Sequence, residues 1–225
     1  MATVLMVRHG QAAFGSDHYD RLSDRGRQQA RWLGEHLAAL GHVPVRAVAG
    51  TLARQRDTAV EILHAMGLSQ SVRLQQDAGL NEYDGDSIYR AHTAGADQLE
   101  HQRRDFRDYW RTFRAAMQRW SDDDLVGVTE SWGEFGARVR RAVDEVCAGS
   151  AREDILLVVS SGGAIGRLIA DLLGAPAQTA IELNLQCRNT GLCELIAGRD
   201  TLRVMSFNGI AHLSQPERHH AITYA

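Results

Sequence analysis

The chain has 225 residues, of which 44% are hydrophobic and 24% charged, as is typical of a globular protein with enough apolar material for a core. Its 25 basic residues are all arginine, and against 28 acidic residues they leave a net charge of −3. The absence of lysine excludes a phosphate loop that ends in lysine, a pyridoxal Schiff base and a lysine general base. The slightly acidic balance, with no basic block, argues against nucleic acid as a partner.

The order of the patterns along the chain predicts the fold class. Short β-branched runs alternate with helical spacing, which favours a three-layer α/β/α sandwich around a mostly parallel central sheet. The length favours one domain over residues 1–225, with an insertion. Strands are expected at residues 3–7, 45–49, 71–74, 155–160, 191–196 and 201–207.

Helix signals lie between these strands. Ser23 is a candidate N-cap for a helix that Gly41 ends, and a second helix is expected over residues 51–66. After the fourth strand, Gly162 and Gly163 lead into an apolar helical pattern. A capping-box pair, Ser131 and Glu134, precedes another helix.

The strand signal disappears from about residue 83 to residue 130, where we expect a helical cap insertion. An apolar stripe with helical spacing is surrounded by arginines. We interpret the stripe as core and the arginines as solvated; a ligand-binding stripe is the alternative. The stripe comprises Leu99, Phe106, Tyr109, Trp110, Phe113, Met117 and Trp120.

The cysteines and the N-terminus predict the cellular compartment. Cys147, Cys187 and Cys193 form no C-x-x-C pair, so reduced thiols are expected and a zinc site is not. The apolar run that begins at Met1 ends at Arg8, too short for a signal peptide or a membrane span. We therefore expect a cytoplasmic protein without a membrane partner.

The tripeptide Arg8-His9-Gly10 follows directly on the first predicted strand. In open α/β sheets, ligands bind outside the carboxyl ends of the strands, so this position favours a site. The tripeptide alone is equally compatible with a hydrogen-bonded structural histidine.

Further motifs occur in order along the chain, and together with Arg8-His9-Gly10 they resemble the histidine phosphatase superfamily, which has the phosphoglycerate mutase-like fold. They are residues 22–30, Leu52-Ala53-Arg54 with Thr58-Ala59, Leu80-Asn81-Glu82, Glu130-Ser131 before Arg138-Val139, Val159-Ser160 before Gly162-Gly163, and residues 208–213.

This resemblance implies a phosphate site that needs neither metal nor cofactor. His9 matches the nucleophile that becomes a phosphohistidine, Arg8 and Arg54 match the two phosphate-binding arginines, and Glu82 matches the proton donor. Planar guanidinium groups suit this task, because they contact phosphoryl oxygens in bidentate fashion. Adjacent Arg⁺ should keep His9 neutral, and Glu82 must hold a proton near neutral pH.

One position departs from the family pattern Ser-His-Gly-Gly, because Ser161 stands where the family has a second histidine. Loss of one preorganised donor typically costs on the order of 10² to 10³ in turnover. Arg8, Arg54 and the backbone N–H groups at Gly162 should still bind an anion, and Gln11 is a further candidate donor.

Other residues are candidate replacements for the missing histidine or depart further from the family pattern. Ser161 is not expected to be a hydrolase nucleophile, because Gly-x-Ser-x-Gly would need glycine at Val159. The histidines that could stand in are His18, His92 and His212, each expected at the surface. Gly50 and Gln55 are smaller departures, at positions where the family often has serine and alanine.

The predicted function is a metal-independent phosphomonoester hydrolase that acts on a phosphorylated small molecule. One alternative is a catalytically degenerate member that binds a phosphorylated ligand or inorganic phosphate. The other is a cofactor-dependent phosphoglycerate mutase. The sequence assigns neither the substrate nor the oligomeric state.

Overall fold

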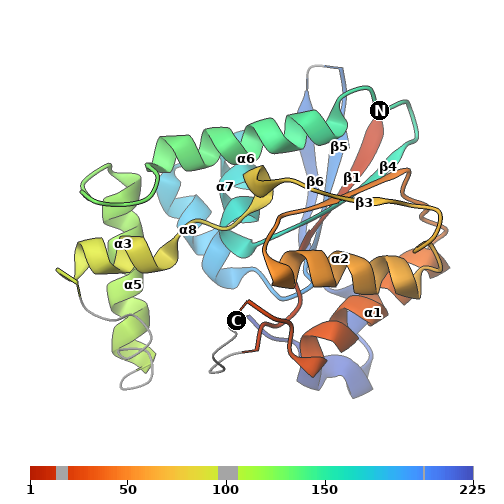
Figure 1. Ribbon diagram of the computed structural model, residues 1–225, viewed down its shortest axis with the longest axis horizontal. Helices are drawn as coiled ribbons and strands as arrows, with labels where there is room; N and C mark the ends of the chain where they lie inside the picture. The colour runs from red at the N-terminus through yellow and green to blue at the C-terminus, as the bar shows by residue number, and fades with distance from the viewer. Residues whose placement is uncertain (14–19, 96–105, 200, 225) are drawn as a thin grey trace.

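The computed structural model describes residues 1–13, 20–95, 106–199 and 201–224 (Figure 1). Six strands form one sheet in the order β3-β2-β4-β1-β5-β6. Strands β3, β2, β4 and β1 are mutually parallel, whereas β5 is antiparallel to both of its neighbours, so the mostly parallel sheet is confirmed. The strands are β1 (Ala2–Arg8), β2 (Arg46–Ala49), β3 (Leu74–Gln76), β4 (Ile155–Ser160), β5 (Leu192–Ala197) and β6 (Leu202–Gly209).

Helices cover both faces of the sheet (Figure 1). The α-helices are α1 (Asp24–Ala39), α2 (Ala53–Ala65), α3 (Gly85–His92), α5 (Phe106–Ser121), α6 (Trp132–Cys147), α7 (Gly162–Leu172) and α8 (Ala177–Gln186). The 3-10 turns are η1 (Ala78–Leu80), η2 (Ala211–Leu213) and η3 (Pro216–Ala221).

Alternation along the strands creates two hydrophobic cores. Successive side chains of a strand point to opposite faces, so Leu5 and Val7 pack with α1 and α2, while Val4 and Met6 pack with α6 and α7. Parallel strands buried on both faces are apolar throughout, which is why β1 and β4 are continuous apolar runs. The α/β/α layering predicted from the sequence is confirmed.

Two expectations about elements need correction. The strand predicted at residues 71–74 begins only at Leu74, because the backbone N–H groups of Ser71 and Val72 bond to the Leu68 carbonyl and continue the turn after α2. Helix α8 was not predicted. Its apolar pattern is short, since only Ala180 and Ile181 are buried.

The segment predicted as a cap contains α3 and α5 among its described residues, and both lie to one side of the sheet (Figure 1). Tyr109, Phe113, Met117 and Trp120 are buried, which confirms the interpretation of these side chains as core. Leu99 lies outside the described residues. The assignment of residues 83–130 as a cap over the site remains a prediction.

The three cysteines are free, as expected. Burial raises the pKa of the Cys187 thiol to about 11, so this thiol stays protonated at neutral pH. Among the described helices, none has the length and apolar character needed to cross a bilayer.

Candidate active site

His9 lies immediately beyond the end of β1, where its backbone N–H donates to Ser160 O at 2.9 Å. Its Nδ1 lies 2.7 Å from Gly10 O, which can only accept, so the ring proton sits on Nδ1 and Nε2 carries a lone pair. Asn189 Nδ2 donates to His9 O at 3.1 Å and fixes the backbone behind the ring. The side chain is therefore oriented with Nε2 as the atom that carries the nucleophilic lone pair.

Both predicted arginines lie beside His9. Arg54, at the start of α2, donates from Nε to His9 Nε2 at 3.2 Å and from Nη1 to Asp20 Oδ1 at 2.8 Å. Arg8 donates from Nη1 to the carbonyl oxygens of Cys187 and Tyr224. Each guanidinium is thus held by hydrogen bonds to fixed acceptors, which limits its rotation.

The Nε atom of Arg8 is buried and makes no hydrogen bond with the described residues. It lies next to Gly162, because a Cβ placed on Gly162 would be 3.5 Å from it. Gly162 is the first residue of α7, where N–H groups and the helix dipole favour an anion. A buried cationic donor and a helix N-terminus therefore converge on one place.

The pKa of His9 is held well below its ordinary value. Burial is the largest cause, followed by the charges of Arg54 and then Arg8. The sequence anticipated the effect of the arginines but not the larger effect of burial. Both causes favour the neutral, nucleophilic imidazole.

Glu82 follows η1 and lies over the first turn of α7. Its Oε2 accepts from Gly163 N at 3.0 Å, and its Oε1 from Tyr83 N at 3.4 Å. Burial raises the pKa of Glu82, while the Gly163 hydrogen bond and the charges of Arg54 and Arg8 oppose the rise. Because both arginines act on Glu82 and on His9, these four side chains form one electrostatic cluster.

Close approach of Glu82 to α7 depends on glycine. A Cβ on Gly163 would lie 2.3 Å from Tyr83 Cε1 and 2.4 Å from Glu82 Oε1, so any larger residue would displace the carboxylate. The second glycine of the sequence motif therefore has a direct steric role.

Ser161 is fully buried, and its side chain does not cap α7. Its Oγ accepts instead from Gln55 Nε2 at 2.8 Å, and the same amide donates to Leu80 O at 3.1 Å. Gln55 is also fully buried, and a Cβ on Gly50 would lie 1.9 Å from its Oε1. The three departures at positions 50, 55 and 161 therefore form one packed cluster.

The remaining candidate residues have diverse positions. Gln11 accepts through Oε1 from Ser23 Oγ at 3.1 Å, so its amide is oriented by the cap of α1. His212 was expected at the surface but is buried. It is 3% exposed and lies 2.9 Å from Thr190 Oγ1, beneath the backbone of Arg8 and His9.

His92 ends α3 and is partly buried, which also differs from the expected surface position, and His18 lies outside the described residues. Within the described ranges, no group of three or more histidine, cysteine, aspartate or glutamate residues is arranged to hold a metal ion.

Sequence reasoning missed two residues that complete the cluster. Asp20 accepts from Arg54 and also from Ala53 N at 2.7 Å, so it caps α2, whose own N-cap residue is Leu52. Asn189 holds the His9 carbonyl. Asp20 carried a signal, since an acidic residue in the loop before Leu22 is a candidate partner for an arginine; Asn189 carried none.

The model of the histidine phosphatase superfamily (branch 1) matches residues 4–209. The chain belongs to this family. The match begins within β1, includes the other five described strands in full and contains all the candidate catalytic residues.

Relatives and solved structures agree with this membership. A probable phosphoglycerate mutase (GpmB) of Erwinia tasmaniensis is 28% identical over 198 residues, which cover 85% of this chain and 83% of the relative. Mycobacterial glucosyl-3-phosphoglycerate phosphatase superposes with a TM-score of 0.66 at 24% identity, covering 92% of this chain and 98% of that one. Phosphoserine phosphatase of Entamoeba histolytica does so with a TM-score of 0.66 at 18% identity, covering 95% and 100%. At these identities the structures support the fold, and the family supports phosphoryl transfer.

Proposed function

We propose that the protein is a phosphomonoester hydrolase that acts through a phosphohistidine on His9. The observation that carries the proposal is the state of His9: a buried neutral imidazole whose Nδ1–H is fixed by Gly10 O and whose Nε2 lies beside Arg54. A neutral nitrogen nucleophile next to two guanidinium groups is suited to attack a phosphoryl group.

In the first step, His9 Nε2 attacks phosphorus, a P–N bond forms and the ester P–O bond breaks. Arg8 and Arg54 balance the charge on the equatorial oxygens, and Arg54 exchanges its contact with Nε2 for a phosphoryl oxygen. Glu82, whose pKa is raised by burial, gives its proton to the leaving oxygen.

In the second step, water attacks the phosphohistidine. The Glu82 carboxylate takes a proton from that water, the P–N bond breaks and neutral His9 returns with inorganic phosphate. None of these steps uses a metal or an organic cofactor, so we expect hydrolysis to be insensitive to chelators. Gln11 and the N–H groups at Gly162 would bind the phosphoryl oxygens.

The substrate class rests on the relatives. The solved neighbours include phosphatases of phosphoserine and of glucosyl-3-phosphoglycerate. Small phosphorylated metabolites are therefore the substrates to screen first, and no nucleic acid or membrane partner is proposed.

The test is to trap the phosphoenzyme. The chain is mixed with radiolabelled phosphomonoesters and quenched in alkali, which preserves phosphohistidine. His9→Gln should lose both label and turnover, while His219→Gln, at an exposed histidine near the C-terminus, should lose neither. Turnover that survives His9→Gln would overturn the proposal.

The buried Ser161 supports a second candidate, a member that binds phosphorylated ligands without turnover, because the Ser161 hydroxyl is held by Gln55 and supplies no positive charge. Phosphate binding without phosphoenzyme formation would favour it. The curated relatives support a third, a phosphoglycerate mutase, which requires interconversion primed by 2,3-bisphosphoglycerate.

A further inference from the structure

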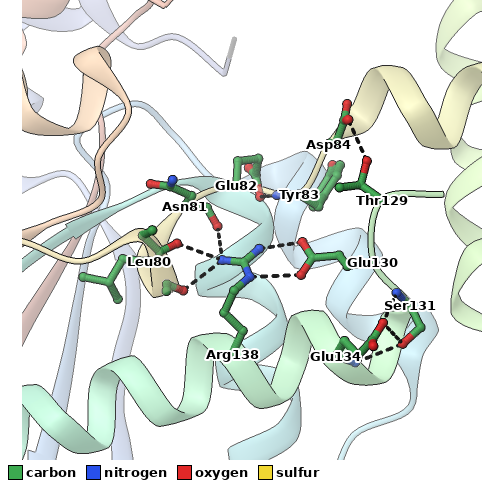
Figure 2. Close-up of polar contacts among 12 residues, drawn as sticks. Leu80, Asn81, Glu82, Tyr83, Asp84, Thr129, Glu130, Ser131, Glu134 and Arg138 are labelled. Carbon is green, nitrogen blue, oxygen red and sulfur yellow. Dashed lines mark hydrogen bonds and ion pairs between the residues drawn. The ribbon is translucent and has the colours of Figure 1, made fainter.

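Arg138, on α6, makes an extensive set of hydrogen bonds beside the candidate active site. Its Nε and Nη2 donate to the two carboxylate oxygens of Glu130, at 2.9 and 2.6 Å (Figure 2). Its Nη1 donates to the carbonyl oxygens of Gly79 and Asn81, each at 3.0 Å, and of Ala78 at 3.3 Å. One guanidinium therefore joins a carboxylate to three backbone carbonyls of residues 78–81.

The Ala78 carbonyl also accepts from Asn81 N at 3.0 Å and closes the η1 turn, whereas the Gly79 and Asn81 carbonyls lie toward its end, where a short helical turn leaves acceptors without intrahelical partners. A cation is favoured at this end of a helical turn. The planar fork of arginine can contact a carboxylate on one edge and carbonyls on the other, which an ammonium group cannot do in the same geometry.

The Asn81 carbonyl belongs to the peptide that ends in the nitrogen of Glu82. Because a peptide unit is planar, holding this oxygen also fixes the direction in which the backbone enters Glu82. The carboxylate of Glu82 then reaches Gly163 N at 3.0 Å. The position of the proposed proton donor thus depends on two anchors, Gly163 at its tip and Arg138 at its base.

Neighbouring contacts hold the same segment from the other side. Thr129 Oγ1 donates to Asp84 Oδ2 at 2.9 Å, directly before Glu130 in the chain (Figure 2). Phe135 packs beneath both parts, with the Arg138 guanidinium 5.1 Å from its ring centre and the Tyr83 ring at 5.5 Å. The Arg138 and Glu130 side chains are 26% and 20% exposed, so their pairing is partly shielded from water.

We infer that Arg138 and Glu130 form a positioning pair that holds Glu82 in place for proton transfer. The inference rests on the proposed function, since it assigns the pair to the acid and base step of that reaction. It predicts a defect specific to esters whose leaving oxygen needs a proton.

The experiment compares two substrates, an alkyl phosphate and p-nitrophenyl phosphate, whose leaving group departs without protonation. Arg138→Gln should lower kcat/KM for the alkyl ester roughly 10- to 100-fold, the range expected when a catalytic group is misplaced by about 1 Å. The value for p-nitrophenyl phosphate should change by less than about 3-fold, since general acid catalysis contributes little there. Glu130→Gln keeps the side-chain shape and one acceptor oxygen, so it should give a smaller loss of the same kind.

Two comparisons make the assignment specific. Arg140→Gln is the matched control, because Arg140 lies on the same helix and pairs with Asp144 at 2.9 Å on an exposed face. It should leave both substrates unaffected. Arg138→Gln added to Glu82→Gln should lower the alkyl rate no further than Glu82→Gln alone, as is expected when one residue acts through another.

Equal losses on both esters, or losses that multiply in the double variant, would overturn the inference and make Arg138 a general structural residue. If urea titrations show that Arg138→Gln is unfolded, the same two esters are compared in Glu130→Gln and Arg138→Lys. A failure of the proposed role of Glu82 would be seen separately. In that case Glu82→Gln would lose no more activity on the alkyl ester than on p-nitrophenyl phosphate.

Discussion

Ser161→His restores the residue that the family has at this position. Introduced alone, we expect it to destabilise the fold and not to raise turnover. Ser161 is fully buried, and Gln55 Nε2 lies 2.8 Å from its Oγ. An imidazole would have to enter space that the Gln55 amide already fills. The companion change Gln55→Ala vacates that space.

The magnitude follows from these contacts. Forcing a larger side chain into a packed site costs about 1–3 kcal/mol, and loss of the Gln55 hydrogen bond adds about 0.5–1.5 kcal/mol. We therefore expect Ser161→His to lower the free energy of unfolding by roughly 2–4 kcal/mol. This is a large fraction of the ~5–15 kcal/mol of a typical domain.

Gln55→Ala should cost less than an ordinary buried truncation. Its Oε1 is buried without a hydrogen-bond partner among the described residues, so its removal also removes an unfavourable group. The Leu80 carbonyl keeps the hydroxyl of Ser160, at 2.6 Å. In the double variant the imidazole occupies the vacated volume, so we expect a favourable coupling of about 1–3 kcal/mol.

The assay is urea unfolding of the four proteins in this cycle, with phosphatase kinetics on each. Turnover should increase only in the double variant, by up to the roughly 10²-fold that one preorganised donor supplies. Wild-type stability and raised turnover in Ser161→His alone would refute the steric argument. A double variant no more stable than the sum of the single changes would refute the coupling.

Three further predictions follow from individual contacts. Gly163→Ala places a Cβ 2.4 Å from Glu82 Oε1 and should lower kcat/KM for alkyl phosphates roughly 10²-fold, measured against p-nitrophenyl phosphate as the less sensitive ester. Burial lowers the pKa of His212 to about 3. Below pH ~6.5 the unfolded chain therefore binds a proton that the folded chain does not bind, and the free energy of unfolding decreases as the pH decreases. Between pH 7 and 5, His212→Gln should remove about 2 kcal/mol of this loss in urea titrations; an unchanged slope would contradict the assignment. Asp20→Asn retains a cap for α2 but removes the negative charge that competes with phosphate for the Arg54 guanidinium. Since the Asp20 side chain is 45% exposed, inhibition by phosphate should tighten only about 2- to 5-fold. Unaltered or weaker inhibition would contradict this competition.

The fold was predictable wherever sequence pattern and burial agree. Strands β1 and β4 are buried on both faces, so their continuous apolar runs located them to within a residue. Strand β3 has three residues, two of them exposed, and therefore leaves almost no pattern. Helix α8 buries too few residues to produce a clear period.

The candidate site was predictable in its components but not in their mutual support. The order of the motifs placed His9, Arg8, Arg54 and Glu82 in one site, and these four interact in the structure. Contacts between distant segments left no comparable signal. Residues 50, 55 and 161 looked like separate departures in sequence, yet Gly50 is required by the Gln55 side chain, which in turn bonds to Ser161.

The arginines of the site gain a clearer role from their surroundings. With no lysine in the chain, positive charge at the site depends on the guanidinium groups of Arg8 and Arg54. Both are held by hydrogen-bond acceptors: Arg54 by Asp20, and Arg8 by the carbonyls of Cys187 and Tyr224. Groups fixed in this way need little reorganisation when charge develops in the transition state. The buried Nε of Arg8 makes no hydrogen bond with the described residues and lies beside Gly162, so it is a donor that a phosphoryl oxygen there could use. In the proposed reaction this buried donor would bind a phosphoryl oxygen and so partly offset the charge that Ser161 does not supply.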